Sequence, residues 1–170
     1  MRKTVLMIVL TWAVSGCGSV PMTHTEYRDA VKQSDSSLLT RDSFEVGRSF
    51  ADVSRSIQRK ASECLNYQLA INIRENNVNR IAQERGKPTL IASKNKLEMY
   101  FQAKVTPSGN IMKEPPDGLY LLLAEAYPIG KGRTKVDIYR ARVEVVAQAI
   151  KAWAWGKEQG CPDPARIFPR

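Results

Sequence analysis

Histidine is almost absent from this chain of 170 residues, because His24 is the only one. Acid-base and nucleophilic sites commonly place a histidine beside the reacting group. No Gly-x-Ser-x-Gly segment occurs that would carry a nucleophilic serine. No spacing typical of a paired-carboxylate site links the acidic candidates Glu98, Glu125, Asp137 and Glu144. The sequence therefore gives no support for catalysis, and we expect a protein that is not an enzyme.

Metal and phosphate motifs are also lacking. A zinc site needs about four ligands at short spacings, whereas the chain has three isolated cysteines and one histidine. Lys131 lies between two glycines, but a phosphate-binding loop needs an earlier glycine and a following helix. The residues after Gly132 instead alternate as in a strand. We therefore predict no cofactor and no metal.

No apolar run is long enough to cross a membrane. The run from Thr4 to Val14 has eleven residues, and a membrane-spanning helix needs about 20. Arg2 and Lys3 precede this run, and the small residues Ser15 and Gly16 follow it. A positive start, a short apolar stretch and small residues are typical of a cleaved signal peptide.

The four residues Val14-Ser15-Gly16-Cys17 resemble the lipobox of bacterial lipoproteins. That resemblance implies cleavage before Cys17, a diacylglycerol on its sulfur and an acylated new amino terminus. Several acyl chains together give stable membrane anchoring. Gly18, in place of an aspartate, implies the outer membrane, facing the periplasm. We expect a signal peptide over 1–16, a lipidated flexible tether over 17–42 and one domain over 43–170.

Positive charge exceeds negative charge in the mature chain. Without Arg2 and Lys3, 24 Lys and Arg residues remain against 17 Asp and Glu, a formal net charge of about +7. Such a surplus favours anionic partners. Export makes lipid head groups, lipopolysaccharide or cell-wall polymers the available anions, and we expect no nucleic acid. The alternative is a basic surface that serves only solubility.

Two cysteines remain once Cys17 is lipidated. In an exported domain, Cys64 and Cys161 are most simply a disulfide. The bridge would close a loop of about 97 residues, and the chain-entropy model gives a loop near 100 residues about 4 to 5 kcal/mol. Two unpaired buried thiols are the alternative.

Apolar periodicity predicts an α+β domain. Ser49, followed three residues later by Asp52, indicates the start of a helix. Strict alternation indicates strands, and Gly130-Lys131-Gly132 indicates a hairpin. The expected strands cover 43–48, 67–73, 97–105, 119–127 and 134–138, and the expected helices cover 50–66 and 142–155. The predicted order is β-α-β-β-β-β-α, with four to five antiparallel strands and two helices on one face.

The segment 75–96 shows no clear period, apart from a possible short strand over 89–92. A loop of this length is unusual unless it functions or moves. It is our candidate for anion binding, and a plain solvated loop is the alternative. The candidate cations are Arg74, Arg80, Arg85, Lys87, Lys94 and Lys96.

Trp155 lies off the apolar stripe of the last helix. An exposed tryptophan there would suit a protein interface. We expect instead that the tail after Cys161 covers it, since Pro162 and Pro164 make that tail rigid.

The order of elements over 43–160 resembles the helix-grip domain of envelope lipoproteins, as in the C lipoprotein of the barrel-assembly machinery. The lipobox and the Cys-Pro-Asp tail are similar to those of small proteobacterial lipoproteins. This chain is too short for tandem domains, so no partner is implied. We expect an accessory lipoprotein that binds an envelope protein through the uncovered sheet face or the segment 75–96. The alternative is a binder of anionic polymer or lipid head groups through that segment.

Overall fold

The computed structural model describes residues 20–34, 39–75, 78–107, 113–141, 143–157 and 160–167. Residues 73–75 and 78–79 are described by their backbone alone. The expected signal peptide, Cys17 and Gly18 lie outside the described residues.

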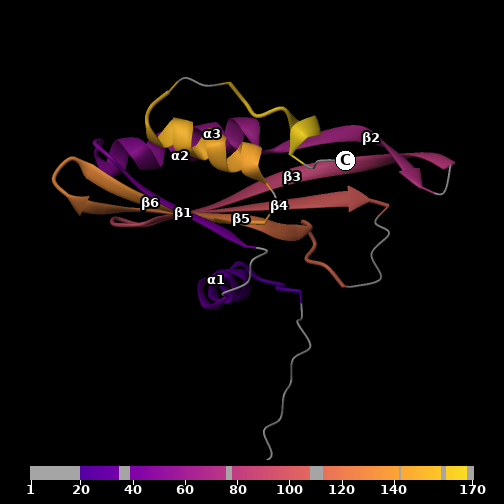
Figure 1. Ribbon diagram of the computed structural model, residues 1–170, viewed down its shortest axis with the longest axis horizontal. Coiled ribbons are helices and arrows are strands. Elements are labelled where there is room, and N and C mark those ends of the chain that lie inside the picture. The colour runs from indigo at the N-terminus through magenta and orange to yellow at the C-terminus, as the bar shows by residue number, and fades with distance from the viewer. Residues whose placement is uncertain are drawn as a thin grey trace, which may run out of the picture.

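One antiparallel sheet of six strands forms the centre of the protein (Figure 1). Its spatial order is β1-β6-β5-β4-β3-β2. The strands are β1 Thr40–Val46, β2 Tyr67–Glu75, β3 Val78–Ala92, β4 Leu97–Thr106, β5 Leu119–Gly130 and β6 Arg133–Arg140. The α+β class is therefore correct, but the expected count of four to five strands is wrong.

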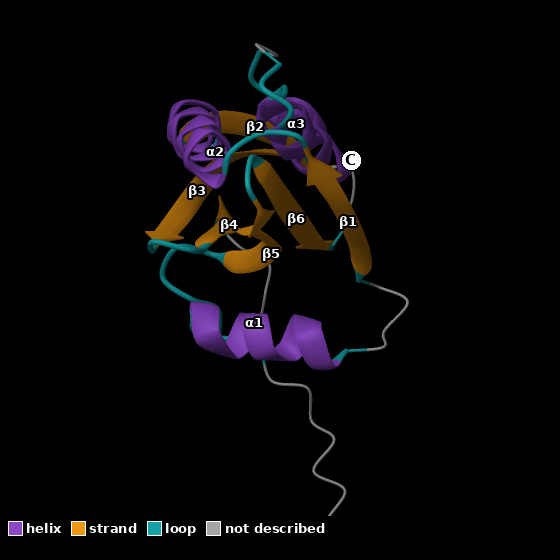
Figure 2. Ribbon diagram, turned by 90° about the vertical axis from the view of Figure 1, so that its left-hand side faces the viewer, coloured by secondary structure: helices purple, strands orange, loops and turns teal. Residues whose placement is uncertain are grey.

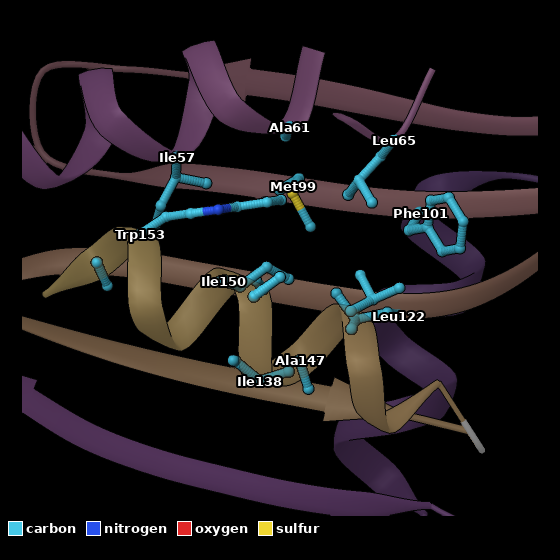
Figure 3. Packing of buried hydrophobic residues seen from close by; sticks show 14 of the residues in the cluster. Ile57, Ala61, Leu65, Met99, Phe101, Leu122, Ile138, Ala147, Ile150 and Trp153 are labelled. Carbon is cyan, nitrogen blue, oxygen red and sulfur yellow. The ribbon is translucent and has the colours of Figure 1, made fainter. Parts of the chain in front are cut away.

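Two helices, α2 Phe50–Cys64 and α3 Glu144–Ala154, lie side by side over one face of this sheet (Figure 2). The start of α2 follows the sequence prediction, because the Ser49 hydroxyl accepts from the Asp52 amide at 3.2 Å. Large apolar side chains fill the space between helices and sheet (Figure 3). They include Ile57, Leu65, Met99, Phe101, Leu122, Ile138, Ile150 and Trp153, all at most 1 % exposed. Each such burial contributes about 1.5 to 3 kcal/mol.

Two residues outside α3 stabilise its C-terminal end, Arg48 and Gly156. The Arg48 guanidinium donates to the carbonyl oxygens of Trp153 and Ala154, at 3.2 and 2.9 Å. Gly156 has a φ of +76°, which side chains disfavour. A Cβ there would lie 2.9 Å from Arg48 Cζ.

The tail is joined to α2 by the disulfide between Cys64 and Cys161, whose Cα atoms are 4.9 Å apart. The predicted pairing is therefore confirmed. Beyond it, a short 3-10 helix η1, Pro164–Arg166, precedes Ile167, which is 1 % exposed in the core. The disulfide thus holds a tail that contributes to the main core.

A third helix, α1 His24–Gln33, covers the other face of the sheet (Figure 2). The expectation of a flexible tether over 17–42 is wrong for these residues, and β1 begins at Thr40. The Thr23 hydroxyl accepts from the Glu26 amide at 3.2 Å and caps the helix. Tyr27 and Val31, one turn apart, are each 5 % exposed against the sheet. Helices therefore cover both faces of the sheet. Helices α2 and α3 lie on one face, as expected, and α1 on the other is additional.

The expected loop over 75–96 is also wrong, because β3 occupies most of it. Gly86 and Pro88 look like loop residues in the sequence, but each has a place in the sheet. Tyr67 lies over Gly86, where an added Cβ would be 2.3 Å from the tyrosine ring. Pro88 lies beyond the end of β2, whose pairing with β3 stops at Gly86. Its missing N–H therefore costs no hydrogen bond on that side.

Candidate functional site

Three carboxylates lie in one row across the face that α1 covers. Glu98 of β4 is opposite Glu125 of β5, and Glu125 is opposite Asp137 of β6. All three are buried, at 7 %, 3 % and 3 % exposure. We call Glu98, Glu125 and Asp137 the acidic row. Because like charges opposite one another destabilise a sheet, the fold depends on how this row is neutralised.

Lysines bridge the acidic row. Lys96 Nζ lies 2.6 Å from Glu98 Oε1 and 2.7 Å from Glu125 Oε1. Lys32 Nζ, from α1, lies 2.8 Å from both Glu125 oxygens. Partial burial opposes the charge on Lys96, but the two carboxylates outweigh it and raise the pKa of this amine. Lys96 is therefore an internal counter-charge and belongs to no anion-binding loop.

Tyrosine hydroxyls complete the row. Tyr100 donates to Glu98 Oε2 at 2.9 Å, and Tyr127 donates to Asp137 Oδ2 at 2.8 Å. Burial opposes the ionisation of Glu98, but the hydrogen bonds from Lys96 and Tyr100 outweigh it and lower the pKa of that carboxyl. Burial likewise opposes the ionisation of Asp137, and hydroxyls and nearby cations hold its pKa below the usual range. Both carboxylates are stabilised in the charged form.

Helix α1 adds an apolar contact over these charges. Tyr27 and Val31 pack into a cluster with Tyr100, Leu123 and Tyr139. The Tyr27 hydroxyl is buried without a hydrogen-bond partner among the described residues, and burial raises its pKa. Asp137 Oδ1 is also buried without a hydrogen-bond partner among the described residues, and Arg41 Nη2 lies 3.9 Å from it. The other carboxylate oxygens of the acidic row are enclosed and paired, which makes the row a support for α1.

A second polar row lies on the same face, outside α1. Gln68 of β2 is opposite Arg85 of β3, and Arg85 is opposite Lys104 of β4. Lys104 is six residues from Glu98 along β4, so both side chains leave the same face. We call Gln68, Arg85 and Lys104 the basic row. With Gln83 and Thr106 of the neighbouring register position, it lines an open hollow of about 250 Å³.

The counter-charges of the basic row lie at one side of it. Arg85 Nη2 is 3.1 Å from Asp117 Oδ1 and 3.4 Å from the Pro116 carbonyl oxygen. Lys104 Nζ donates to the same carbonyl at 3.2 Å and lies 3.8 Å from Glu114. The Arg85 side chain is 45 % exposed. The two cations therefore stay accessible to solvent.

The six predicted cations do not form one surface. Lys96 belongs to the acidic row, and Lys87 shares Asp117 with Arg85. Lys94 lies in the turn before β4, beside a hollow of about 460 Å³ along α2. Arg80 is exposed on β3 and Arg74 lies on β2, its side chain outside the described residues.

Four members of the open hollow went unrecognised in the sequence, namely Gln68, Gln83, Lys104 and Thr106. The signal that could have found them is the alternation of β3, where Gln83, Arg85 and Lys87 fall on one face.

Trp155 is 47 % exposed, so the expectation that the tail covers it is wrong. It borders a hollow of about 290 Å³ with Lys151 and Lys157. Trp155 follows α3 directly, where Gly156 turns the chain away from the core.

The described residues contain no group of three His, Cys, Asp or Glu side chains arranged as metal ligands. Within the same ranges, every helix is too short or too polar to span a membrane.

Comparison with known proteins gives only a distant similarity. No protein-family model matches the chain, and no curated protein matches it. The solved structure of a hypothetical protein from Helicobacter pylori aligns over 84 % of this chain and 95 % of that chain, with 12 % sequence identity and a TM-score of 0.37. No property of that protein is transferred to this chain.

Proposed function

We propose that this is a lipid-anchored, non-enzymatic envelope protein that binds another envelope protein by accepting an extended segment at the edge of β2. The observation that carries the proposal is the outer edge of this nine-residue strand, which pairs with no other described strand. Its first seven residues, Tyr67 to Ile73, carry no charge, and Arg74 and Glu75 end the strand. A long edge with an uncharged stretch is a template for a further strand.

The opposite edge of the sheet differs. Strand β1 carries Arg41, Asp42 and Glu45 within seven residues. Charged side chains along an edge oppose pairing with another chain. Because charges are spread along β1 but lie only at the last two residues of β2, Arg74 and Glu75, β2 is the better docking strand.

The neighbouring part of β3 adds an apolar contact. Strand β3 pairs with β4 only from Gln83 onward, so Val78–Ala82 pairs with β2 alone. Ile81 in this arm is 75 % exposed, more than any other large hydrophobic residue that the structure describes. An exposed isoleucine beside a free edge suits a protein partner.

The expected anchor limits where the partner lies. Six residues, 18–23, separate the expected lipid anchor at Cys17 from α1. Even a fully extended chain advances only about 3.3 to 3.6 Å per residue, so this link spans at most about 25 Å. The proposed partner therefore lies close to the membrane.

Site-specific crosslinking in cells tests strand addition. A photoreactive residue at Asn72, which is exposed on β2, should capture an envelope protein. Ala70→Lys should abolish this adduct because it places a charge on the edge strand, whereas Ala70→Thr should preserve it. A reactive residue at Ser43 of β1 is the control. Equal capture from Ser43, or capture of a second copy alone, would contradict the proposal.

The anchor has a separate test. Cys17→Ala should release the protein from the membrane fraction, since the acylated sulfur is lost. Fractionation with the wild-type protein as control gives the answer, and persistence in the membrane would contradict lipid anchoring through Cys17.

A second candidate function, the binding of an anionic envelope ligand, is favoured by the open basic row.

A further inference from the structure

We infer that the basic row and the hollow above it bind an acidic sugar, a pyranose unit that carries one carboxylate or phosphate. This site is independent of strand addition at β2, because it uses the face of the sheet and leaves the edge free.

The two cations of the basic row lie close enough to repel one another. Arg85 and Lys104 are direct cross-strand neighbours, so their charges repel one another. Lys32 and Lys96 contact the acidic row on the same face, whereas among the described residues the counter-charges of the basic row are Glu114 and Asp117, at one side of it. An anion in the hollow would relieve the repulsion from the other side.

Arg85 has donors available for this anion. Its hydrogen bonds to Pro116 and Asp117 both use Nη2. A guanidinium has five N–H donors, and those on Nε and Nη1 have no partner within the described ranges. Because each parallel pair of guanidinium donors includes Nη2, the donors on Nε and Nη1 act separately, and each can bind one oxygen of a carboxylate, a phosphate or a hydroxyl.

The remaining lining groups are suited to hydroxyls. Gln68 Nε2 donates to Gln83 Oε1 at 3.0 Å, which orients both amides. This pairing leaves Gln68 Oε1 free to accept and Gln83 Nε2 free to donate. The Thr106 hydroxyl can both donate and accept. Sugar hydroxyls also donate and accept, so they can satisfy all three groups.

Size and lining narrow the ligand class. A hollow of about 250 Å³ equals roughly eight waters at about 30 Å³ each, which is more than one small inorganic anion fills. Its lining residues are all polar or charged. An acyl chain or an aromatic ring would therefore find no apolar side chain to pack against.

Binding measurements with defined probes test the site. The probes are a glucuronic acid disaccharide and a hexose phosphate; the controls are a neutral disaccharide and inorganic phosphate. At least one acidic sugar should bind the full-length protein in detergent, more tightly than either control, and binding should weaken with salt. The two acidic probes distinguish a carboxylate from a phosphate. Binding of neither, or equal binding of inorganic phosphate or the neutral sugar, would overturn the proposal.

Variants connect binding to this hollow. Arg85→Gln and Lys104→Gln should each weaken binding about tenfold, the factor that one charged hydrogen bond supplies. Lys94→Gln removes an exposed cation outside the hollow and should change nothing. If all three variants bind alike, the site lies elsewhere and the proposal is wrong.

Asp117→Asn should act in the opposite direction. It removes the carboxylate that competes for Arg85 and Lys87, so an acidic sugar should bind several-fold tighter. A misfolded variant would lose binding, which makes the sign of this change informative. Unchanged or weaker binding by a folded Asp117→Asn protein would contradict the inference.

Discussion

The two charged rows on one face of the sheet differ in what neutralises them. Lys32, Lys96 and two tyrosine hydroxyls hold the acidic row beneath α1. The basic row is open, and the two carboxylates near it lie at one side. Buried charges that are fully paired serve the fold, because an unpaired one would be costly. Exposed like charges that face each other contribute little to stability and suit an anionic ligand.

Replacing a lysine by methionine in each setting should give the largest difference in stability. Lys96→Met should cost about 2 kcal/mol, because it leaves two buried carboxylates without their shared partner. This is less than the roughly 3 to 5 kcal/mol of a fully buried pair, since the Lys96 side chain is 39 % exposed. Lys104→Met should change stability by less than about 0.5 kcal/mol. Chemical denaturation measures the free energy of unfolding of both variants. Equal losses of stability would contradict the distinction between the two rows.

Two tyrosines between α1 and the sheet, Tyr27 of α1 and Tyr100 of β4, give a smaller difference in stability. Tyr100→Phe removes a hydrogen bond to a charged carboxylate and should cost about 1 to 2 kcal/mol. Tyr27→Phe removes a buried hydroxyl that has no partner among the described residues, so stability should stay the same or rise by up to about 1 kcal/mol. Thermal unfolding compares them, and a larger loss from Tyr27→Phe would be the wrong result for this account.

Low pH should weaken the contact between α1 and the acidic row before it affects α3. The folded pKa values of Glu98 and Asp137 lie below their usual range. Their stabilisation is therefore present above the unfolded values near 4 and is lost as the pH falls through the folded values. Hydrogen exchange of the α1 amides should accelerate below about pH 4 relative to those of α3. Acceleration that begins above pH 6 would contradict this assignment.

Several features could be predicted because they depend on a short stretch of sequence or because only one arrangement was available. The Ser49 cap, the apolar positions of β4 and the pairing of Cys64 with Cys161 depend on short patterns or on elimination. Strand β3 was missed because Gly86 and Pro88 resemble loop residues. Only the position of Tyr67 and the end of β2 explain why a strand tolerates them.

Helix α1 was missed because its apolar signal consists of Tyr27 and Val31 alone. The face of the sheet that α1 covers includes the polar side of β4, where Glu98, Tyr100 and Gln102 are buried. The two rows could not be predicted at all. Their members are 12 or more residues apart where strands differ, and only the register of pairing brings them together.

The central claim is that the open basic row binds a ligand while the covered acidic row supports α1. Backbone amide chemical shifts recorded while a glucuronic acid disaccharide or hexose phosphate is added test it most directly. The account predicts that at least one probe shifts the amides of Arg85, Lys104 and Thr106, while those of Glu98, Glu125 and Asp137 stay in place. Shifts centred on the acidic row, or no shifts from either probe, would contradict the account.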